Sequence, residues 1–349
     1  MKIDTQLFFL ILILSLVGLY FFYGVSLPYS TKIFNNPLYY FKKFLIFNFF
    51  LPLLMFFIGY FMNWLFLMRI AKIIFIVNII FLILPFFDFF KLPNQSTARW
   101  FYLKGISFQP SEFMKLSLLL FLTSTLPLIK KNLSYFYISL IIIFLTSLII
   151  FIQPALSTLL IILTSTMGAL ITINFKLKNF FIFSIILLFF ILAGFLWNYR
   201  LERVTGIFIS NDKGLSFQLN QSRLAIGSGG LLGKGLGNSD LKLIGLPLMI
   251  SDNIFSVYAE ETGFIGSIIL IILFVYLIFR IIYLGYYNNN ELKKFFSYGV
   301  ACWLSIQVFV HLMANLTIST GVPLPFFSYG PSSQIAIMTA LGIISGFKK

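Results

Sequence analysis

Ten stretches of mostly apolar residues follow one another along the chain, separated by polar segments that are usually short. A helix needs about 20 predominantly apolar residues to cross a bilayer, and in lipid a helix satisfies all its own backbone groups. We therefore expect an all-α polytopic membrane protein, folded as one domain over residues 1–349. The predicted spans are Leu7–Leu27, Phe44–Met62, Ile70–Phe87, Ser111–Leu128, Phe136–Ile152, Leu156–Ile173, Phe180–Trp197, Ile254–Ile282, Phe296–Ile318 and Ser332–Phe347.

Two boundaries in this pattern need comment. The first stretch is too long for the core of a signal peptide and lacks a small-residue cleavage site, so we interpret it as an uncleaved span. Gln153-Pro154 separates the fifth and sixth stretches, and either two spans or one broken hairpin fits this pair.

The segment from Tyr199 to Asp252 is the one long polar interruption of the apolar pattern. It is rich in glycine and contains six basic residues: Arg200, Arg203, Lys213, Arg223, Lys234 and Lys242. A basic, glycine-rich platform on a membrane-embedded body suggests a site for an anionic lipid substrate.

Composition supports the membrane assignment. The chain is 60% hydrophobic and 10% charged, with a mean hydropathy of +0.99, whereas a soluble domain carries about 25% charged residues. The net charge of +15 is explained by basic residues that flank spans and hold their orientation, and no nucleic-acid-binding motif is present. Cys302 is the only cysteine, which excludes an internal disulfide.

The distribution of Lys and Arg predicts the orientation. Ten spans put both termini on one side, and the loops of that side carry twelve Lys and Arg against six in the short loops of the other. Basic residues in short loops favour the cytoplasm. We therefore expect both termini in the cytoplasm and the 199–252 loop outside.

Glu112 and Lys115 are ionisable residues at the start of the fourth predicted span. Their spacing of three places them on one helical face, where they can pair. One interpretation is a structural ion pair, and the other is a lysine that offers positive charge to a diphosphate in a cavity.

Asp252 follows the platform and precedes a strongly apolar stretch. Aspartate is a favoured helix N-cap, so a plain cap is one interpretation. The other is a general base at the outer surface, which accepts a proton from an attacking sugar hydroxyl.

The glycine-rich run from Gly227 to Gly237 matches neither the Walker A motif nor G-x-G-x-x-G, and the strand and helix that flank those motifs are absent. We expect an interfacial loop, whose exposed backbone N–H groups offer a place for a diphosphate. His311, the only histidine, has no second His or Cys nearby for a metal cluster, and we expect it to pack between helices.

Several short motifs occur in a recognisable order. They are Arg99-Trp100, Ser107-Phe-Gln-Pro-Ser-Glu-Phe-Met-Lys115, Gln153-Pro154, Tyr199-Arg200 with Arg203, Gln218 to Ser239, Leu246-Pro247, Ser251-Asp252 with Ile254-Phe255, Ala259-Glu-Glu261 with Gly263, and Pro323-Leu-Pro-Phe-Phe-Ser-Tyr-Gly330. Together they resemble the SEDS family, which includes FtsW, RodA and SpoVE, over most of the chain from Arg99 to Phe347. Arg203-Val-Thr205 and Gly235-Leu-Gly-Asn-Ser239 are more similar to the cell-division branch, FtsW, than to the elongation branch.

The resemblance implies a peptidoglycan glycosyltransferase that polymerises lipid II at the outer face of the bacterial cytoplasmic membrane. It implies a class B penicillin-binding protein as partner, together with other membrane proteins of division or elongation. The essential loop acid of the family matches Asp252, and its Arg-Trp arginine and Q-P-S-E-F-x-K lysine match Arg99 and Lys115. We expect Arg203 and Lys234 to help bind the diphosphate, with Glu112 beside Lys115. No cofactor is implied, and a divalent cation stays open.

The chain also departs from the family pattern. Ala155 stands where the family has an acid after Gln-Pro, so Lys115 is expected to depend on Glu112 or on substrate for neutralisation. Ser251 precedes Asp252 in a loop that lacks the usual Pro-Glu-x-His-Thr, and Pro331 replaces a glycine. Two alternatives therefore stand beside the enzyme: a lipid II flippase or transporter without chemistry, and a non-catalytic scaffold for division proteins.

Overall fold

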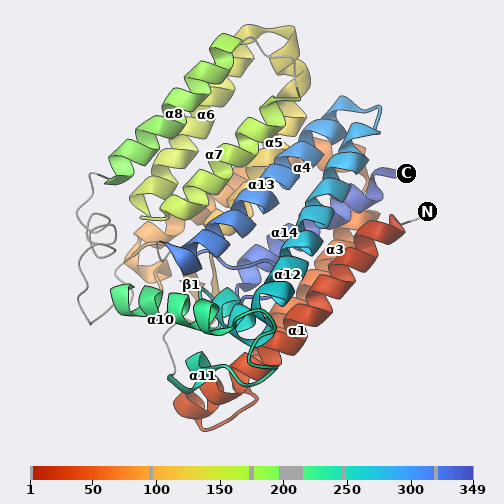
Figure 1. The fold of residues 1–349 in the computed structure, drawn as a ribbon. Helices are drawn as coiled ribbons and strands as arrows, with labels where there is room; N and C mark the ends of the chain where they lie inside the picture. The colour runs from red at the N-terminus through yellow and green to blue at the C-terminus, as the bar shows by residue number, and fades with distance from the viewer. Residues whose placement is uncertain are drawn as a thin grey trace.

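The computed structural model describes residues 3–93, 97–172, 177–195, 215–244, 249–317 and 321–348, most of which lie in helices (Figure 1). Each predicted span overlaps a helix, and within the described ranges seven helices are long and apolar enough to cross a membrane. The all-α multi-pass fold is thus confirmed, while the total of ten crossings stays a prediction. The helices that correspond to the ten predicted spans are α1 (Thr5–Phe34), α2 (Tyr39–Phe44) continued by a π-helix (Leu45–Phe50) into α3 (Leu51–Phe61), α4 (Trp64–Ile83), α5 (Pro110–Lys131), α6 (Leu133–Ile152), α7 (Leu156–Leu170), α8 (Leu177–Phe195), α12 (Ile254–Tyr286), α13 (Glu291–Leu316) and α14 (Pro331–Ser345).

Polar residues at the ends of the apolar stretches define where the helices begin. Four helices begin after an Asp or Asn whose side-chain oxygen accepts a hydrogen bond from a backbone N–H of the first turn, as expected of these residue types. Two others begin with a proline, which lacks the N–H that a first turn leaves unpaired. The caps are Asp4, Asn63, Asn132 and Asn290, and the prolines are Pro110 and Pro331.

Helices α5 and α13 form the centre of the bundle. In α5, 72% of the most apolar stretch is buried within the protein, and in α13 56%, against 28–39% for the other five long helices. Both carry polar side chains inward, and α13 packs against α5, α7 and α12. A buried polar side chain on these two helices therefore meets protein rather than lipid.

Small residues let two helices approach closely at the C-terminal end of the chain. A methyl group on Gly59 of α3 would lie 2.6 Å from the carbonyl oxygen of Thr339 in α14, and one on Gly342 would lie 2.1 Å from that of Phe56. This reciprocal contact, typical of helix packing in membranes, joins the last helix to the second predicted span.

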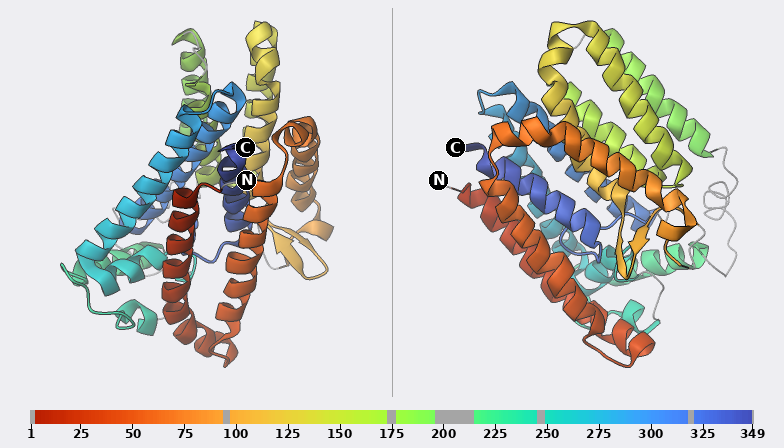
Figure 2. Two further views of the ribbon diagram at one scale, coloured as in Figure 1. Left: turned by 90° about the vertical axis from the view of Figure 1, so that its right-hand side faces the viewer. Right: turned by 180° about the vertical axis from the view of Figure 1, so that it is seen from behind.

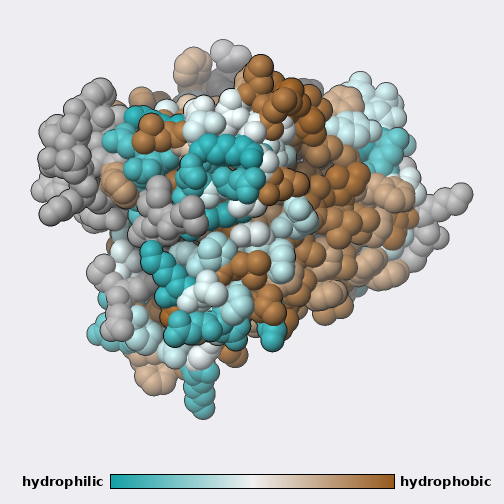
Figure 3. Space-filling model, turned by 60° about the horizontal axis from the view of Figure 1, so that its bottom comes forward, coloured by the Kyte–Doolittle hydropathy of each residue, from teal (hydrophilic) through white to brown (hydrophobic). Residues whose placement is uncertain are grey.

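The two ends of the bundle differ in structure. Both termini lie at one end (Figures 1 and 2), where the Arg280 guanidinium donates two hydrogen bonds to the buried carboxylate of Asp4. The short helices α10 (Leu215–Ser228) and α11 (Asp240–Ile244) lie at the other end, near the hairpin of β1 (Phe101–Leu103) and β2 (Ile106–Phe108). Figure 3 brings this second end forward and shows hydrophilic surface on one side of a broad hydrophobic band.

Candidate functional site

Asp252 lies at the platform end, one residue before the N-cap of α12. The cap is Asn253, so the interpretation of Asp252 as a plain helix cap does not hold. Asp252 is half-buried. Its carboxylate is therefore placed at the boundary between the protein and the exterior of the bundle.

The backbone around Asp252 is held from three directions. Each residue of the segment from Ile250 to Asn253 accepts one hydrogen bond from another part of the chain. The donors and distances are the Tyr329 N–H to the Ile250 carbonyl (2.9 Å), the Ser328 hydroxyl to the Ser251 carbonyl (2.6 Å), the Asn315 amide to the Asp252 carbonyl (3.0 Å) and the Ser222 hydroxyl to the Asn253 side chain (3.3 Å). Loop backbone fixed in this way presents its side chain from a defined position.

Asn315 is the buried centre of this arrangement. Its Nδ2 donates to the carbonyl oxygens of Asp252 and His311, and its Oδ1 accepts from the Ser256 hydroxyl at 2.6 Å. One fully buried side chain thus joins the end of α13 to the start of α12. Sequence reasoning missed this role, because an asparagine in a predicted span is more simply explained by helix packing.

Gly321 leaves room beside the Asp252 carboxylate. A methyl group at Gly321 would lie 3.3 Å from Oδ2 of Asp252, a distance at which one of the two must give way. Gly321 itself is exposed. A side chain at position 321 would therefore crowd the Asp252 carboxylate.

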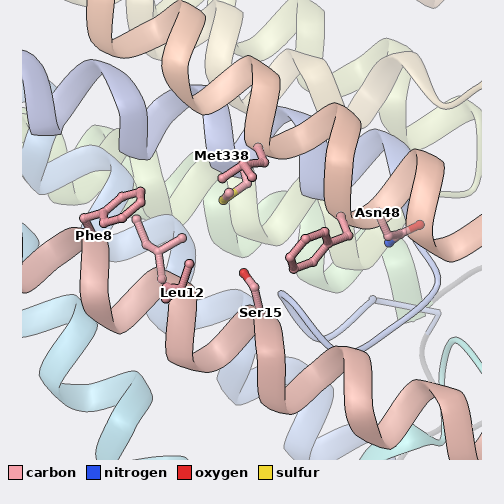
Figure 4. A pocket seen from close by; sticks show the side chains of 8 residues that line it. Phe8, Leu12, Ser15, Asn48 and Met338 are labelled. Carbon is pink, nitrogen blue, oxygen red and sulfur yellow. The ribbon is translucent and has the colours of Figure 1, made fainter.

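The segment that holds Asp252 is supported in turn from α3's side of the bundle. Asn48, in the π-helix, donates from Nδ2 to the carbonyl of Ser328 at 3.0 Å. It also lines a small cavity whose other labelled walls are mainly apolar (Figure 4). This cavity offers no cluster of charged groups, and we do not assign it a part in the chemistry.

Arg99 secures the break between α6 and α7. Its Nε donates to the carbonyl of Gln153 at 2.9 Å, and Nη2 donates to the carbonyl of Pro154. The Gln153 side chain donates to the carbonyl of Leu82 at 2.7 Å. The predicted Gln153-Pro154 boundary is therefore a turn between two separate helices, and Arg99 binds its carbonyl groups.

Lys115 and Glu112 form the ion pair that their spacing predicts, at 2.7 Å. The Lys115 side chain is fully buried and also donates to Oε1 of Gln307 at 3.0 Å. Gln307 continues this network by donating to the Pro323 carbonyl and the Ser333 hydroxyl, both at 3.0 Å. In this arrangement the positive charge of Lys115 is paired with Glu112 inside the bundle.

Lys115 and Asp252 contact α13 at two different positions along its axis. Their partners on that helix, Gln307 and Asn315, are eight residues apart, which corresponds to about 12 Å of helix axis. The structure thus brings both residues to α13 without bringing them into contact.

Lys234 is held by two carboxylates, with 2.7 Å to Asp240 and 2.7 Å to Glu260. These hydrogen bonds, to Asp240 first and then to Glu260, raise the pKa of Lys234 above its ordinary value. The buried Glu260 also accepts from the Ser239 hydroxyl and from two backbone N–H groups. Lys234 therefore orders the platform in this structure.

The glycine run is inserted into a break of α12. Gly263 has φ 67° and ψ −165°, which interrupts the helix, and Lys234 and Gly235 donate their N–H groups to the carbonyls of Glu260 and Glu261. The N–H groups of α12 beyond the break return two bonds to loop carbonyls. The expectation that the loop offers free N–H groups to a diphosphate is wrong for these two residues, because they donate to α12.

The remaining candidates divide as follows. Arg203 lies outside the described residues. His311 packs as expected, buried with Nδ1 donating to the Val322 carbonyl at 2.7 Å. Within the described residues, no three His, Cys, Asp or Glu side chains gather as metal ligands.

Known proteins resemble the whole chain. The FtsW/RodA/SpoVE model of cell cycle proteins matches residues 4–349. A probable peptidoglycan glycosyltransferase FtsW of Buchnera aphidicola subsp. Acyrthosiphon pisum is 34% identical over 345 residues, covering 95% of this chain and 86% of the relative. The stage V sporulation protein E of Bacillus subtilis is 29% identical, covering 98% and 95%.

Solved structures share the fold. A chain of a peptidoglycan synthase complex superposes with a TM-score of 0.78 at 22% identity, covering 99% of this chain and 97% of that chain. The rod shape determining protein RodA of Thermus thermophilus superposes with a TM-score of 0.69 at 22% identity, covering 100% and 97%.

Proposed function

The chain belongs to the FtsW/RodA/SpoVE family, and from that premise we propose that it is a peptidoglycan glycosyltransferase that polymerises lipid II for cell division. Relatives named as probable peptidoglycan glycosyltransferases support the activity and the division role. The substrate and the chemistry are argued from the site.

Asp252 acts as the general base of an inverting sugar transfer. It accepts the proton of the acceptor hydroxyl, the oxygen attacks the anomeric carbon of the lipid-linked donor, and the diphosphate leaves from the opposite face with the bonding electron pair. A positioned base contributes roughly 10²–10⁴-fold to such a step. The half-buried carboxylate on a segment held by four hydrogen bonds, three of them to backbone carbonyls, is the observation that carries this assignment.

The cationic candidates take different parts. Arg99 donates to backbone carbonyl groups and Lys115 pairs with Glu112, so we assign both residues to positioning the helices around the site. If substrate displaces these partners, either cation becomes available to stabilise the charge that develops on the diphosphate. We also propose that Lys234 and Arg203, on the platform, help to bind the diphosphate.

Our proposal also assigns the two ends of the bundle to opposite sides of the membrane. We propose that the end with both termini faces the cytoplasm and that the end with Asp252 faces outward, where lipid-linked sugars are polymerised. The fold shared with a chain of a peptidoglycan synthase complex supports a class B penicillin-binding protein as partner.

Purified protein, with and without the penicillin-binding partner, tests the proposal on labelled lipid II. We expect glycan strands on a gel from the wild type and none from Asp252→Ala. Equal unfolding temperatures would show that both proteins are folded. Polymerisation by Asp252→Ala at the wild-type rate would overturn the role of Asp252. If neither protein makes glycan strands and the wild type moves lipid II across a vesicle membrane, the result would favour a transporter instead.

A further inference from the structure

Arg223, on α10, differs from the other described basic residues of the platform. Lys234 is paired with Asp240 and Glu260, and Lys242 is paired with Glu261. Among the residues that the structure describes, Arg223 has no carboxylate partner, and its side chain is exposed. It therefore carries the one platform charge that is not neutralised within the described chain.

One hydrogen bond orients the Arg223 guanidinium. Its Nε donates to the carbonyl of Leu316, near the end of α13, at 2.7 Å. An arginine near a helix C-terminus commonly binds the last carbonyls, and this contact uses one of its five donors. The two Nη groups form the flat fork that matches phosphate oxygens, and they have no other partner in the described residues.

The same bond ties the guanidinium to the end of α13 that also holds the Asp252 segment. Leu316 follows Asn315, whose amide holds the Asp252 carbonyl, and Ser222, the neighbour of Arg223, donates to Asn253. Given backbone and side-chain dimensions, the guanidinium and the Asp252 carboxylate lie on the order of 10 Å apart.

This spacing suits the reaction. The base contacts the attacking oxygen at hydrogen-bond distance, and that oxygen starts about 3 Å from the anomeric carbon. The departing diphosphate is bonded to the same carbon. Its phosphorus atoms therefore lie within roughly 10 Å of the base, given the same two contacts.

We infer that Arg223 binds the diphosphate of the lipid-linked donor, with the Leu316 carbonyl fixing the plane of the guanidinium. The inference rests on the proposed function for the identity of the donor. A charged and pre-oriented fork binds with little loss of side-chain freedom, and its contact strengthens as negative charge develops on the leaving group.

Binding measurements test this contact without turnover. The full chain with Asp252→Asn, in a neutral maltoside detergent free of phospholipid, is titrated with undecaprenyl diphosphate and with undecaprenol. We expect Arg223→Gln to weaken binding of the diphosphate about tenfold, the loss of one charge-assisted contact, and to leave undecaprenol unchanged. Arg223→Lys, which keeps the charge without the fork, should give an intermediate loss.

Arg69→Gln is the matched control, since Arg69 is an exposed arginine of α4, which begins beside Phe347 at the opposite end of the bundle. It should change neither affinity. Equal binding of undecaprenyl diphosphate by wild type and Arg223→Gln would overturn the inference. So would a loss that appears only in nanodiscs containing phosphatidylglycerol, because Arg223 would then bind a bilayer headgroup.

A turnover assay separates this inference from the proposed function. With the native Asp252, Arg223→Gln should lower kcat/KM for lipid II about tenfold or more, because the contact is stronger in the transition state than in the bound substrate. Absence of polymerisation by the wild type would refute the glycosyltransferase while the binding arm still decides on Arg223.

Discussion

Replacing Asn315 by leucine removes a side chain of α13 that binds the Asp252 segment. The substitution preserves approximate volume but deletes the donor to the Asp252 carbonyl and the acceptor of the Ser256 hydroxyl. Because Asn315 is fully buried, water cannot readily replace either partner. The carbonyl of Asp252 and the hydroxyl of Ser256 are then left unpaired.

The magnitude follows from these two losses. Each buried polar group left without a partner costs about 1–3 kcal/mol. The two losses should therefore lower the free energy of unfolding by about 2–6 kcal/mol. The catalytic effect is larger than a fall in stability implies, because a base displaced by about 1 Å can cost 10²-fold in rate. We expect kcat for glycan polymerisation to fall about 10²-fold with a KM for lipid II within about threefold of wild type.

The assay combines initial rates on labelled lipid II with thermal unfolding, so that rates refer to folded protein. Asp4→Asn is the matched control: it breaks the buried ion pair with Arg280 at the opposite end, costing about 3 kcal/mol, yet should keep kcat. Asn315→Asp adds a further readout, because a second negative charge should move the acid limb of the pH–rate profile to higher pH.

Three outcomes would refute this reasoning. A wild-type kcat in folded Asn315→Leu would mean that Asp252 is positioned without Asn315. A fall in kcat equal to that of Asp4→Asn would indicate general destabilisation. An unchanged acid limb in Asn315→Asp would place Asn315 too far from the titrating group to influence it.

Two further predictions concern glycines. Gly321→Val places a side chain against Oδ2 of Asp252, where even a methyl group would lie 3.3 Å away, and we expect kcat/KM to fall about tenfold, or 1.4 kcal/mol, with unfolding temperature unchanged; a wild-type rate would show that substrate approaches from another side. Gly233→Ala should release the glycine run, since Gly233 has φ +84° and its new Cβ would lie 2.1 Å from the Glu261 carbonyl oxygen. Faster hydrogen exchange over residues 229–241 measures this release, and unchanged protection would contradict it.

The helices could be predicted from the sequence because lipid leaves the backbone few choices. Apolar length gave the spans, and Asp or Asn residues marked several of their starts, as Asn132 does between α5 and α6. The pair of Glu112 and Lys115 was predictable for the same reason, since a spacing of three on one helix fixes the contact.

The site could be predicted only in part, because its contacts join distant segments. Asn315 lies 63 residues from Asp252, and Gln307 lies 192 from Lys115, so no local pattern connects them. The break at Gly263 was missed because the stretch Ile254–Ile282 as a whole is apolar enough for one uninterrupted span, despite Glu260 and Glu261 just before the glycine. The pairing of Lys234 with Glu260, one of its two carboxylate partners, was missed because Glu260 belongs to that span.

The insertion of the glycine run into α12 has a consequence for biogenesis. Residues 229–235 leave the ribosome before Glu260 and Glu261, whose carbonyls later accept their N–H groups. A chain is made from its N-terminus, so this loop emerges while the carbonyls that later bind it are still inside the ribosome. Arrest at a length where the glycine run has left the ribosome but Glu260 and Glu261 have not should therefore give a loop that protease cuts readily.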